Sequence, residues 1–275
     1  MKTVSVITIC RNEEKGIKNT MDSVLAQEWT DFEYIVKDGA STDDTVIIAE
    51  SYKEAFEKKG IALRIISDPD KGIFDAMNRA AGEADGEWVI FMNAGDAFHS
   101  KNTLKLIFDG KKYDKADLLY GDTLEEEFGE FYYFRKFPDR IKERMPFSHQ
   151  SVFARKELLR EFPFDLNYPI AADYNFLLCA YNAGKVFKDT GVCVAVVTKD
   201  GVSSVKLKDT YLESIRLRRD RGIEQPTDEE IKKGMWKIDI KQFVMDHFPA
   251  WSKYIVRRIQ RKIRHQYTIE YKKDF

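Results

Sequence analysis

The chain has 275 residues, of which 43% are hydrophobic and 33% are charged, and its formal net charge is −1. A chain of this length can bury a sizeable core, and a charge close to zero excludes a general attraction to nucleic acid. The three cysteines (Cys10, Cys179 and Cys193) form no C-x-x-C pair. We therefore predict free thiols and neither a zinc site nor a redox site.

Short apolar runs alternate with segments of helical periodicity through the first hundred residues. Strands are predicted over 3–9, 32–38, 62–68 and 87–93, and helices between them over 14–27, 41–60 and 72–84. This alternation favours a parallel sheet covered by helices on both faces, with ligands at the carboxyl ends of the strands. The loops at those ends read CRNEE, DGAS, SDPDKG and NAGDAF. Charged and turn-forming residues therefore gather at one edge of the predicted sheet.

The remainder of the chain divides into two regions. The first is mixed, with helices predicted over 101–110 and 170–184, strands over 116–122 and 129–137, and a strand-rich segment over 185–204. We expect it to extend the first sheet and to supply the second wall of the site. A helix is predicted over 207–222, and Thr227 and Glu230 have the spacing of a capping box. We expect residues 1–98 and 99–205 to form two halves of one domain, with the ligand site between them, and residues 206–275 to form a helical extension.

Residues 251–267 combine an apolar helical face with six basic residues. Such a segment can lie in a membrane interface. It can also pack on the rest of the protein or on a second copy in a homodimer, and both alternatives stay open. The sequence shows neither a signal peptide nor a transmembrane stretch. We therefore expect a cytoplasmic protein, with peripheral attachment to the inner face of the plasma membrane as a further possibility.

Several segments resemble one enzyme family when they are taken together. The segments SVITICRNEEKGIKNTMDSVLAQ, YIVKDGASTDDT, DKGIFDAMNRAAGEADGEWVIFMNAGD, FSHQSVF and AADYNFLL follow one another between about residues 3 and 205. In this order and spacing they resemble the inverting family 2 glycosyltransferases, in particular bacterial enzymes of cell-surface polysaccharide synthesis. The resemblance implies the α/β GT-A fold, a Rossmann-like, mostly parallel sheet flanked by helices. It also implies transfer of a sugar from a nucleotide-sugar, expected to be a UDP-sugar, to a glycan or a lipid-linked acceptor.

The resemblance also implies a divalent metal, Mn²⁺ or Mg²⁺. Such an ion offsets the charge that builds on the departing diphosphate, and one or two protein carboxylates suffice to hold it. Asp96 in NAGD stands at the metal-ligand position of the family. Asn93 stands where the family pattern has an acid. We therefore expect metal binding to depend more on the donor phosphates, and Asn93 to contact either the metal or the donor.

The other implied donor contacts lie at the strand ends. Asp38 resembles the residue that reads the uracil base, and a carboxylate can accept the imide N–H of uracil. For Asn78, a donor contact and a brace within the third helix are weighed evenly. The full set of implied donor-binding residues is Thr8, Arg11, Glu13, Asp38, Lys71, Asn78, Asn93 and Asp96.

Asp173 in AADYNFLL stands where the family carries its catalytic base. A base there accepts the proton of the acceptor hydroxyl, whereas an acid at a helix start can also simply stabilise the helix. Asp122, His149 and Gln150 are implied to lie beside the acceptor or to support the site. Two alternatives stay open: a sugar nucleotidyltransferase, and a donor-binding scaffold without catalysis.

Overall fold

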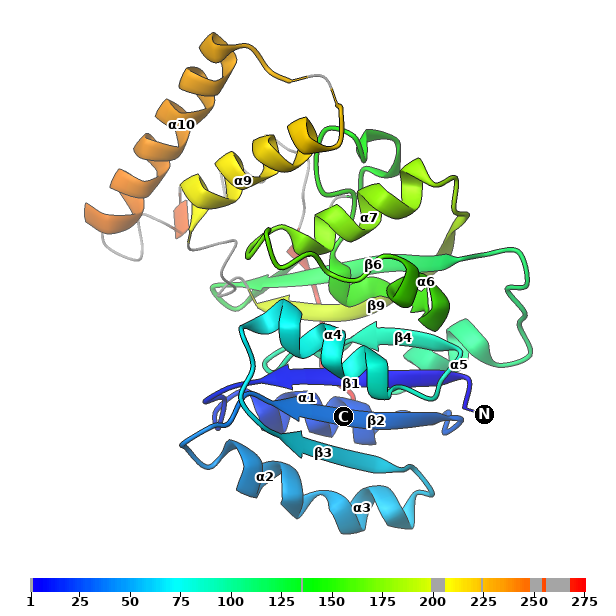
Figure 1. Cartoon of the computed structure of the whole chain (residues 1–275). Coiled ribbons are helices and arrows are strands. Elements are labelled where there is room, and N and C mark those ends of the chain that lie inside the picture. Colours follow the sequence, from blue (N-terminus) through cyan, green and yellow to red (C-terminus); the bar gives the residue numbers. More distant parts are fainter. Residues whose placement is uncertain (1, 135, 199–205, 224, 248–253, 256–267) are drawn as a thin grey trace.

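The computed structural model describes residues 2–134, 136–198, 206–223, 225–247, 254–255 and 268–275. Its first part alternates strands and helices as predicted (Figure 1). These elements are β1 (Val4–Cys10), α1 (Ile17–Leu25), β2 (Phe32–Asp38), α2 (Thr45–Ser51), α3 (Lys53–Lys58), β3 (Leu63–Ser67), α4 (Ile73–Glu83) and β4 (Trp88–Phe91).

The second part is richer in strands. Its elements are β5 (Ala97–Phe98), α5 (Thr103–Phe108), β6 (Leu118–Glu127), β7 (Glu130–Tyr133), the 3₁₀ turns η1 (Pro138–Arg140) and η2 (His149–Ser151), β8 (Val152–Arg155), α6 (Lys156–Glu161), α7 (Ala172–Asn182), β9 (Phe187–Thr198), α9 (Leu207–Asp220), α10 (Asp228–His247) and β10 (Thr268–Ile269). Within the described ranges, no helix is both long and apolar enough to cross a membrane.

A single mixed sheet connects the two parts. Its main path runs in the order β10-β7-β6-β8-β4-β1-β2-β3. The strands β4, β1, β2 and β3 are parallel neighbours, as the alternation with helices predicts. From β4 outward, β8, β7 and β10 pair antiparallel with their neighbours on this path, whereas β9 pairs parallel with β6. Because β8 runs antiparallel to β4, the residues just before β8 lie at the carboxyl end of β4.

Helices cover both faces of the sheet and give two apolar layers. Neighbouring residues of β1 enter different layers, because side chains alternate across a strand: Ile7 packs on the side of α4 and α7, and Val6 on the side of α1 and α5. All residues of β1 and β2 are buried. The carboxyl ends of these strands are therefore held rigidly, as a site at that edge requires.

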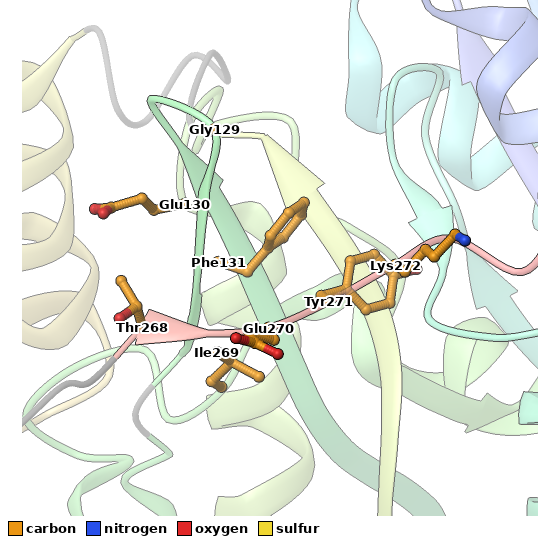
Figure 2. A pocket seen from close by; sticks show the side chains of 8 residues that line it. All are labelled: Gly129, Glu130, Phe131, Thr268, Ile269, Glu270, Tyr271 and Lys272. Carbon is orange, nitrogen blue, oxygen red and sulfur yellow. The ribbon is translucent and has the colours of Figure 1, made fainter.

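The expected helical extension is present as α9 and α10, and the end of the chain adds a short strand to it. Thr268–Ile269 forms the short strand β10, which pairs antiparallel with β7 and covers part of its edge. Tyr271 then packs edge-on against Phe131 and donates a hydrogen bond to the His99 carbonyl oxygen at 2.7 Å. Figure 2 shows these residues around an open pocket beside the strand pair. An unpaired strand edge is a common pairing site, which gives a physical reason for this return to the sheet.

Candidate active site

Sheet topology brings two distant segments together at the carboxyl end of β4. The antiparallel register pairs Ile90 with Phe153 and Trp88 with Arg155. Continued beyond the last pair, this register carries the residues that precede β8 towards residues 93–96. His149 and Gln150 accordingly contact the loop that contains Asn93 and Asp96.

Two residues of α1 hold the 93–96 loop through hydrogen bonds to its backbone. Gly95 has φ of 98°, a conformation that favours glycine. Its N–H donates to the Thr20 hydroxyl oxygen at 3.0 Å, and that oxygen also lies 2.6 Å from the Asp96 carbonyl oxygen. The Asn19 amide donates to the Gly95 carbonyl oxygen at 3.2 Å. These contacts, which the sequence did not indicate, hold the Asp96 side chain at the strand end.

Asp96 is a buried carboxylate that accepts a hydrogen bond from the Gln150 amide at 3.0 Å and another from the Thr198 backbone N–H. Burial raises the pKa of Asp96 to about 6, although the Gln150 hydrogen bond and the nearby His149 oppose the shift. The charge of Glu13 contributes to the same rise. A cation beside Asp96 would stabilise the ionised form that burial disfavours.

His149 lies between the strand-end loop and the start of α7. Its Nδ1 is 3.2 Å from the Asp173 Oδ2 atom, and its Nε2 is 3.3 Å from the Asn93 amide nitrogen. Burial lowers the pKa of His149, but the hydrogen bond and the charge of Asp173 outweigh it and raise the pKa above its ordinary value. Among the residues that the structure describes, the buried Asn93 side-chain oxygen has no hydrogen-bond partner. Asn93, Asp96, His149, Gln150 and Asp173 therefore form one connected cluster.

Asp38 is completely buried, and the chain itself supplies its hydrogen-bond donors. Ser41 donates through its N–H at 2.9 Å and through its hydroxyl, and the Ser67 hydroxyl donates at 2.6 Å. Burial would raise the pKa of Asp38, but these hydrogen bonds hold it below its ordinary value. The Cys10 thiol is a further, weaker donor. A direct contact with uracil would require one of these bonds to give way.

A buried lysine connects β2 to the loop after β3. Lys37 donates to the carbonyl oxygens of Asp38 and Asp68, each at 2.7 Å. It also forms an ion pair with the Asp68 carboxylate at 2.7 Å and lies 3.8 Å from Asp70. The side chain of Asp70 approaches Gly39 so closely that a Cβ at that glycine would lie 2.7 Å from its Oδ2 atom. The sequence pattern placed Asp70 at the polar edge of the sheet, but it did not single out Lys37.

The exposed members of the predicted donor set surround this edge. Arg11 and Glu13 follow β1, and Lys71 precedes α4. Glu13 lies beside Gly16, whose added Cβ would approach the Glu13 carboxylate at 3.1 Å and the Gly95 backbone at 3.2 Å. Burial and the charge of Asp43 raise the pKa of Glu13. Its carboxylate is thus placed near the same loop as Asp96.

Three predicted residues are engaged elsewhere. The fully buried Thr8 donates to the Met92 carbonyl oxygen at 2.7 Å and meets the Tyr34 hydroxyl at 2.8 Å, inside the core. Asn78 uses both ends of its amide on the backbone of one residue of the loop after α6. Asp122 forms an ion pair with Lys136 at 2.8 Å. Thr8 and Asn78 therefore brace the fold in this structure, and Asp122 is committed to a lysine.

The cluster provides few protein ligands for a metal. Within the residues that the structure describes, no group of three or more His, Cys, Asp or Glu side chains could hold an ion. The Asp96 carboxylate and the unpartnered Asn93 oxygen are both hard oxygen atoms, which Mg²⁺ and Mn²⁺ prefer. A divalent ion with two protein oxygens and ligands from phosphate or water is therefore compatible with this edge.

Comparison with solved structures places the fold. The chain superposes on *Staphylococcus aureus* TarS 1–349 in complex with UDP-GlcNAc with a TM-score of 0.65, covering 92% of this chain and 78% of that chain at 21% identity. A mannosyltransferase from Pyrobaculum calidifontis in complex with GDP-Man and Mn²⁺ gives a TM-score of 0.62 at 18% identity, covering 84% of this chain and 68% of that one. The mixed sheet flanked by helices is thus the GT-A fold of these glycosyltransferases.

Comparison of sequences gives the family. The model of glycosyl transferase family 2 matches residues 5–168. A PGL/p-HBAD biosynthesis glycosyltransferase of *Mycobacterium bovis* is 31% identical over 225 residues, which cover 80% of this chain and 86% of that protein. A poly-beta-1,6-N-acetyl-D-glucosamine synthase of Staphylococcus epidermidis is 26% identical over 119 residues, 43% of this chain and 28% of that one. The chain therefore belongs to glycosyltransferase family 2.

Proposed function

We propose that this glycosyltransferase moves a sugar from a UDP-sugar to a glycan or lipid-linked acceptor with inversion at the anomeric carbon. The observation that carries the proposal is the cluster of Asp96, Asn93, His149 and Asp173 at the end of β4. It combines a carboxylate suited to a metal with a second carboxylate at the start of α7. A transferase of this kind needs both on opposite sides of the reacting carbon.

In the proposed step, the acceptor hydroxyl gives its proton to the Asp173 carboxylate while its oxygen forms a bond to the anomeric carbon. The bond from that carbon to the diphosphate breaks on the opposite face, and the diphosphate departs with the electron pair. Asp173 is suited to this role because its side chain is about one fifth exposed and is held by His149. Asp96 and Asn93 would hold a divalent ion, which offsets the charge on the departing diphosphate.

The choice of uridine rests on solved structures of the same fold, and the site supplies positive charge for the diphosphate. Solved structures of the same fold were obtained with UDP or UDP-GlcNAc, and another with GDP-Man. The rim residues Arg11 and Lys71 supply positive charge that a diphosphate requires. A screen of UDP-sugars and GDP-sugars, read by mass spectrometry, should show hydrolysis or transfer of a UDP-sugar with release of UDP. Release of pyrophosphate, or preference for GDP-sugars, would contradict the proposal.

Asp173→Asn tests the base directly, because it keeps the shape of the side chain and removes the proton acceptor. Turnover should fall by ~10²-fold or more while donor affinity changes little. Asp209→Asn is a matched control, since Asp209 occupies the first turn of α9 as Asp173 occupies that of α7. A variant at Asp173 that turns over at the normal rate would place the base elsewhere.

We also propose that the enzyme contacts a membrane surface when it uses a lipid-linked acceptor. The basic segment 251–267 that suggested this lies outside the described residues, apart from Tyr254 and Ile255. Support comes from α10, on which Trp236, Ile240 and Phe243 are exposed at helical spacing. The same face could join two copies in a homodimer, and the vesicle experiment in the Discussion separates the two.

A further inference from the structure

We infer that His149 is a positioning residue whose imidazole ring, in its neutral form, holds the Asp173 carboxylate and the Asn93 amide through its two nitrogens. This inference rests on the proposed function, because it explains how the proposed base is oriented. The ring bridges the two side chains, with Nδ1 at 3.2 Å from Asp173 and Nε2 at 3.3 Å from the Asn93 nitrogen. No other element needs to move for the three groups to act together.

The position of the ring proton follows from the chemistry of the amide. The Asn93 side-chain nitrogen can only donate, so Nε2 of His149 must accept. The proton of the neutral ring then lies on Nδ1, where it is donated to Asp173. The apolar side chains of Phe91, Val152 and other residues line a pocket together with His149 and Asp173. Such surroundings limit the water that would compete for these hydrogen bonds.

The same contact determines the direction of the Asn93 oxygen. Because the amide nitrogen faces His149, the oxygen faces the other way, and within the described part of the chain it has no hydrogen-bond partner. It therefore remains free for an ion that also meets Asp96. An aspartate at position 93 would have no N–H to donate to the neutral ring. This accounts for an asparagine at a place where the family pattern has an acid.

The test observes the ring directly. The full chain, with ¹⁵N-labelled histidine and without metal, is examined by long-range ¹H–¹⁵N spectroscopy at pH 8.5. We expect His149 to carry its proton on Nδ1 with a bare Nε2, whereas a free imidazole prefers the other tautomer. The His149 signal is identified by its loss in His149→Gln or, if that variant does not fold, by replacing the other three histidines. A proton on Nε2, or on both nitrogens, would overturn the inference.

Variants of the partners extend the test. Asn93→Asp should abolish the bare Nε2 of His149, because a carboxylate at position 93 accepts a proton from that nitrogen. Asn93→Ala should keep the proton on Nδ1, where Asp173 still accepts it. Asn19→Ala is the matched control, since Asn19 bonds to Gly95 in the same loop. Persistence of a bare Nε2 in Asn93→Asp would show that the side chain at position 93 does not set the tautomer.

Kinetics then separates this inference from the proposed function. Asn93→Ala should lower kcat by ~10-fold, because the base is less well oriented. An active Asp173→Asn would remove the base assignment and leave the tautomer result standing. An inactive Asp173→Asn combined with the wrong tautomer of His149 would remove the positioning role alone.

Discussion

Burial of the Asp96 carboxylate at the candidate site lowers the stability of the folded protein when this group is ionised. Its pKa of about 6 in the folded protein exceeds the ordinary value of 3.8. The folded state therefore binds the proton more tightly than the unfolded state, and stability falls as pH rises between these two values. Above about pH 6 the full penalty is present, and it amounts to at most about 3 kcal/mol.

Asp96→Asn should therefore stabilise the metal-free protein at pH 7.5, by about 1–3 kcal/mol, and much less at pH 4. The asparagine oxygen can still accept the Gln150 hydrogen bond, so the geometry is preserved. Urea unfolding in EDTA at the two pH values measures the difference, with the exposed Asp114→Asn as the control. Equal stability of the variant and the parent protein at both pH values would show that Asp96 carries no such penalty.

The site residues that could be predicted from the sequence are those that the sheet topology brings to one edge. The family resemblance indicated Asp96, His149 and Asp173. Asp96 follows a parallel strand, and antiparallel β8 brings His149 to the same edge of the sheet. The supports Thr20, Ser67 and Lys37 were missed because they act through buried hydrogen bonds. Such hydrogen bonds depend on the direction in which a side chain points, and hydrophobic periodicity does not predict that direction.

The presence of each helix and strand was predicted more accurately than the residues at its ends or the contacts that it makes. The helix expected over 41–60 is present as α2 and α3, which meet at Tyr52. The strand expected over 116–122 continues to Glu127 as β6, because β7 and β9 pair with its second half. Long-range pairing of this kind overrides a local pattern. The helices expected over 72–84 and 170–184 are present as α4 and α7, and each end lies within two residues of its expected position.

Asn78 of α4 contacts the backbone of Phe164, and the sequence did not predict this contact. Its amide nitrogen donates to the Phe164 carbonyl oxygen at 2.8 Å, and its oxygen accepts the Phe164 N–H at 2.9 Å. The Phe164 ring packs against Phe74 of α4 and Phe176 of α7, with centroids 5.5 and 5.6 Å apart. Asn78 thus fastens α4 to the loop that also supports α7.

Asn78→Ala should lower the free energy of unfolding by about 2–3 kcal/mol, because it leaves an N–H and a carbonyl oxygen of the backbone without partners. Donor affinity, measured by calorimetry with UDP, should change little. Asn182→Ala, at the exposed end of α7, is the control and should cost under about 0.5 kcal/mol. Unchanged stability with weakened UDP binding would instead support the donor contact.

On the scale of the whole molecule, α9 and α10 lie beyond one end of the sheet, on the side away from α2 and α3 (Figure 1). Gly234 of α10 faces Tyr211 of α9 so closely that an added Cβ would lie 2.4 Å from the tyrosine hydroxyl. This close packing fixes which face of α10 is turned outward. The exposed fractions of Trp236, Ile240 and Phe243 on that face are 62%, 44% and 56%.

This outward face yields a prediction for the full chain. Aromatic and aliphatic side chains beside the lysines of α10, followed by the basic segment 251–267, suit an anionic lipid surface. Each basic residue near such a surface contributes on the order of 1 kcal/mol. The full chain should float with vesicles that contain anionic lipid, less so at high salt, and Trp236→Ser with Phe243→Ser should weaken binding by ~10-fold or more.

Ile47→Ser with Leu106→Ser is the matched control, because these apolar side chains are equally exposed but lie on α2 and α5. It should leave flotation unchanged if α10 is the contact. Light scattering on the same proteins distinguishes the alternative: a dimer that the α10 variant converts to a monomer, without vesicle binding by the parent chain, would assign this face to a second copy. Binding that neither pair of substitutions reduces would exclude α10 as the membrane contact, since the lipid would then be held by another part of the chain.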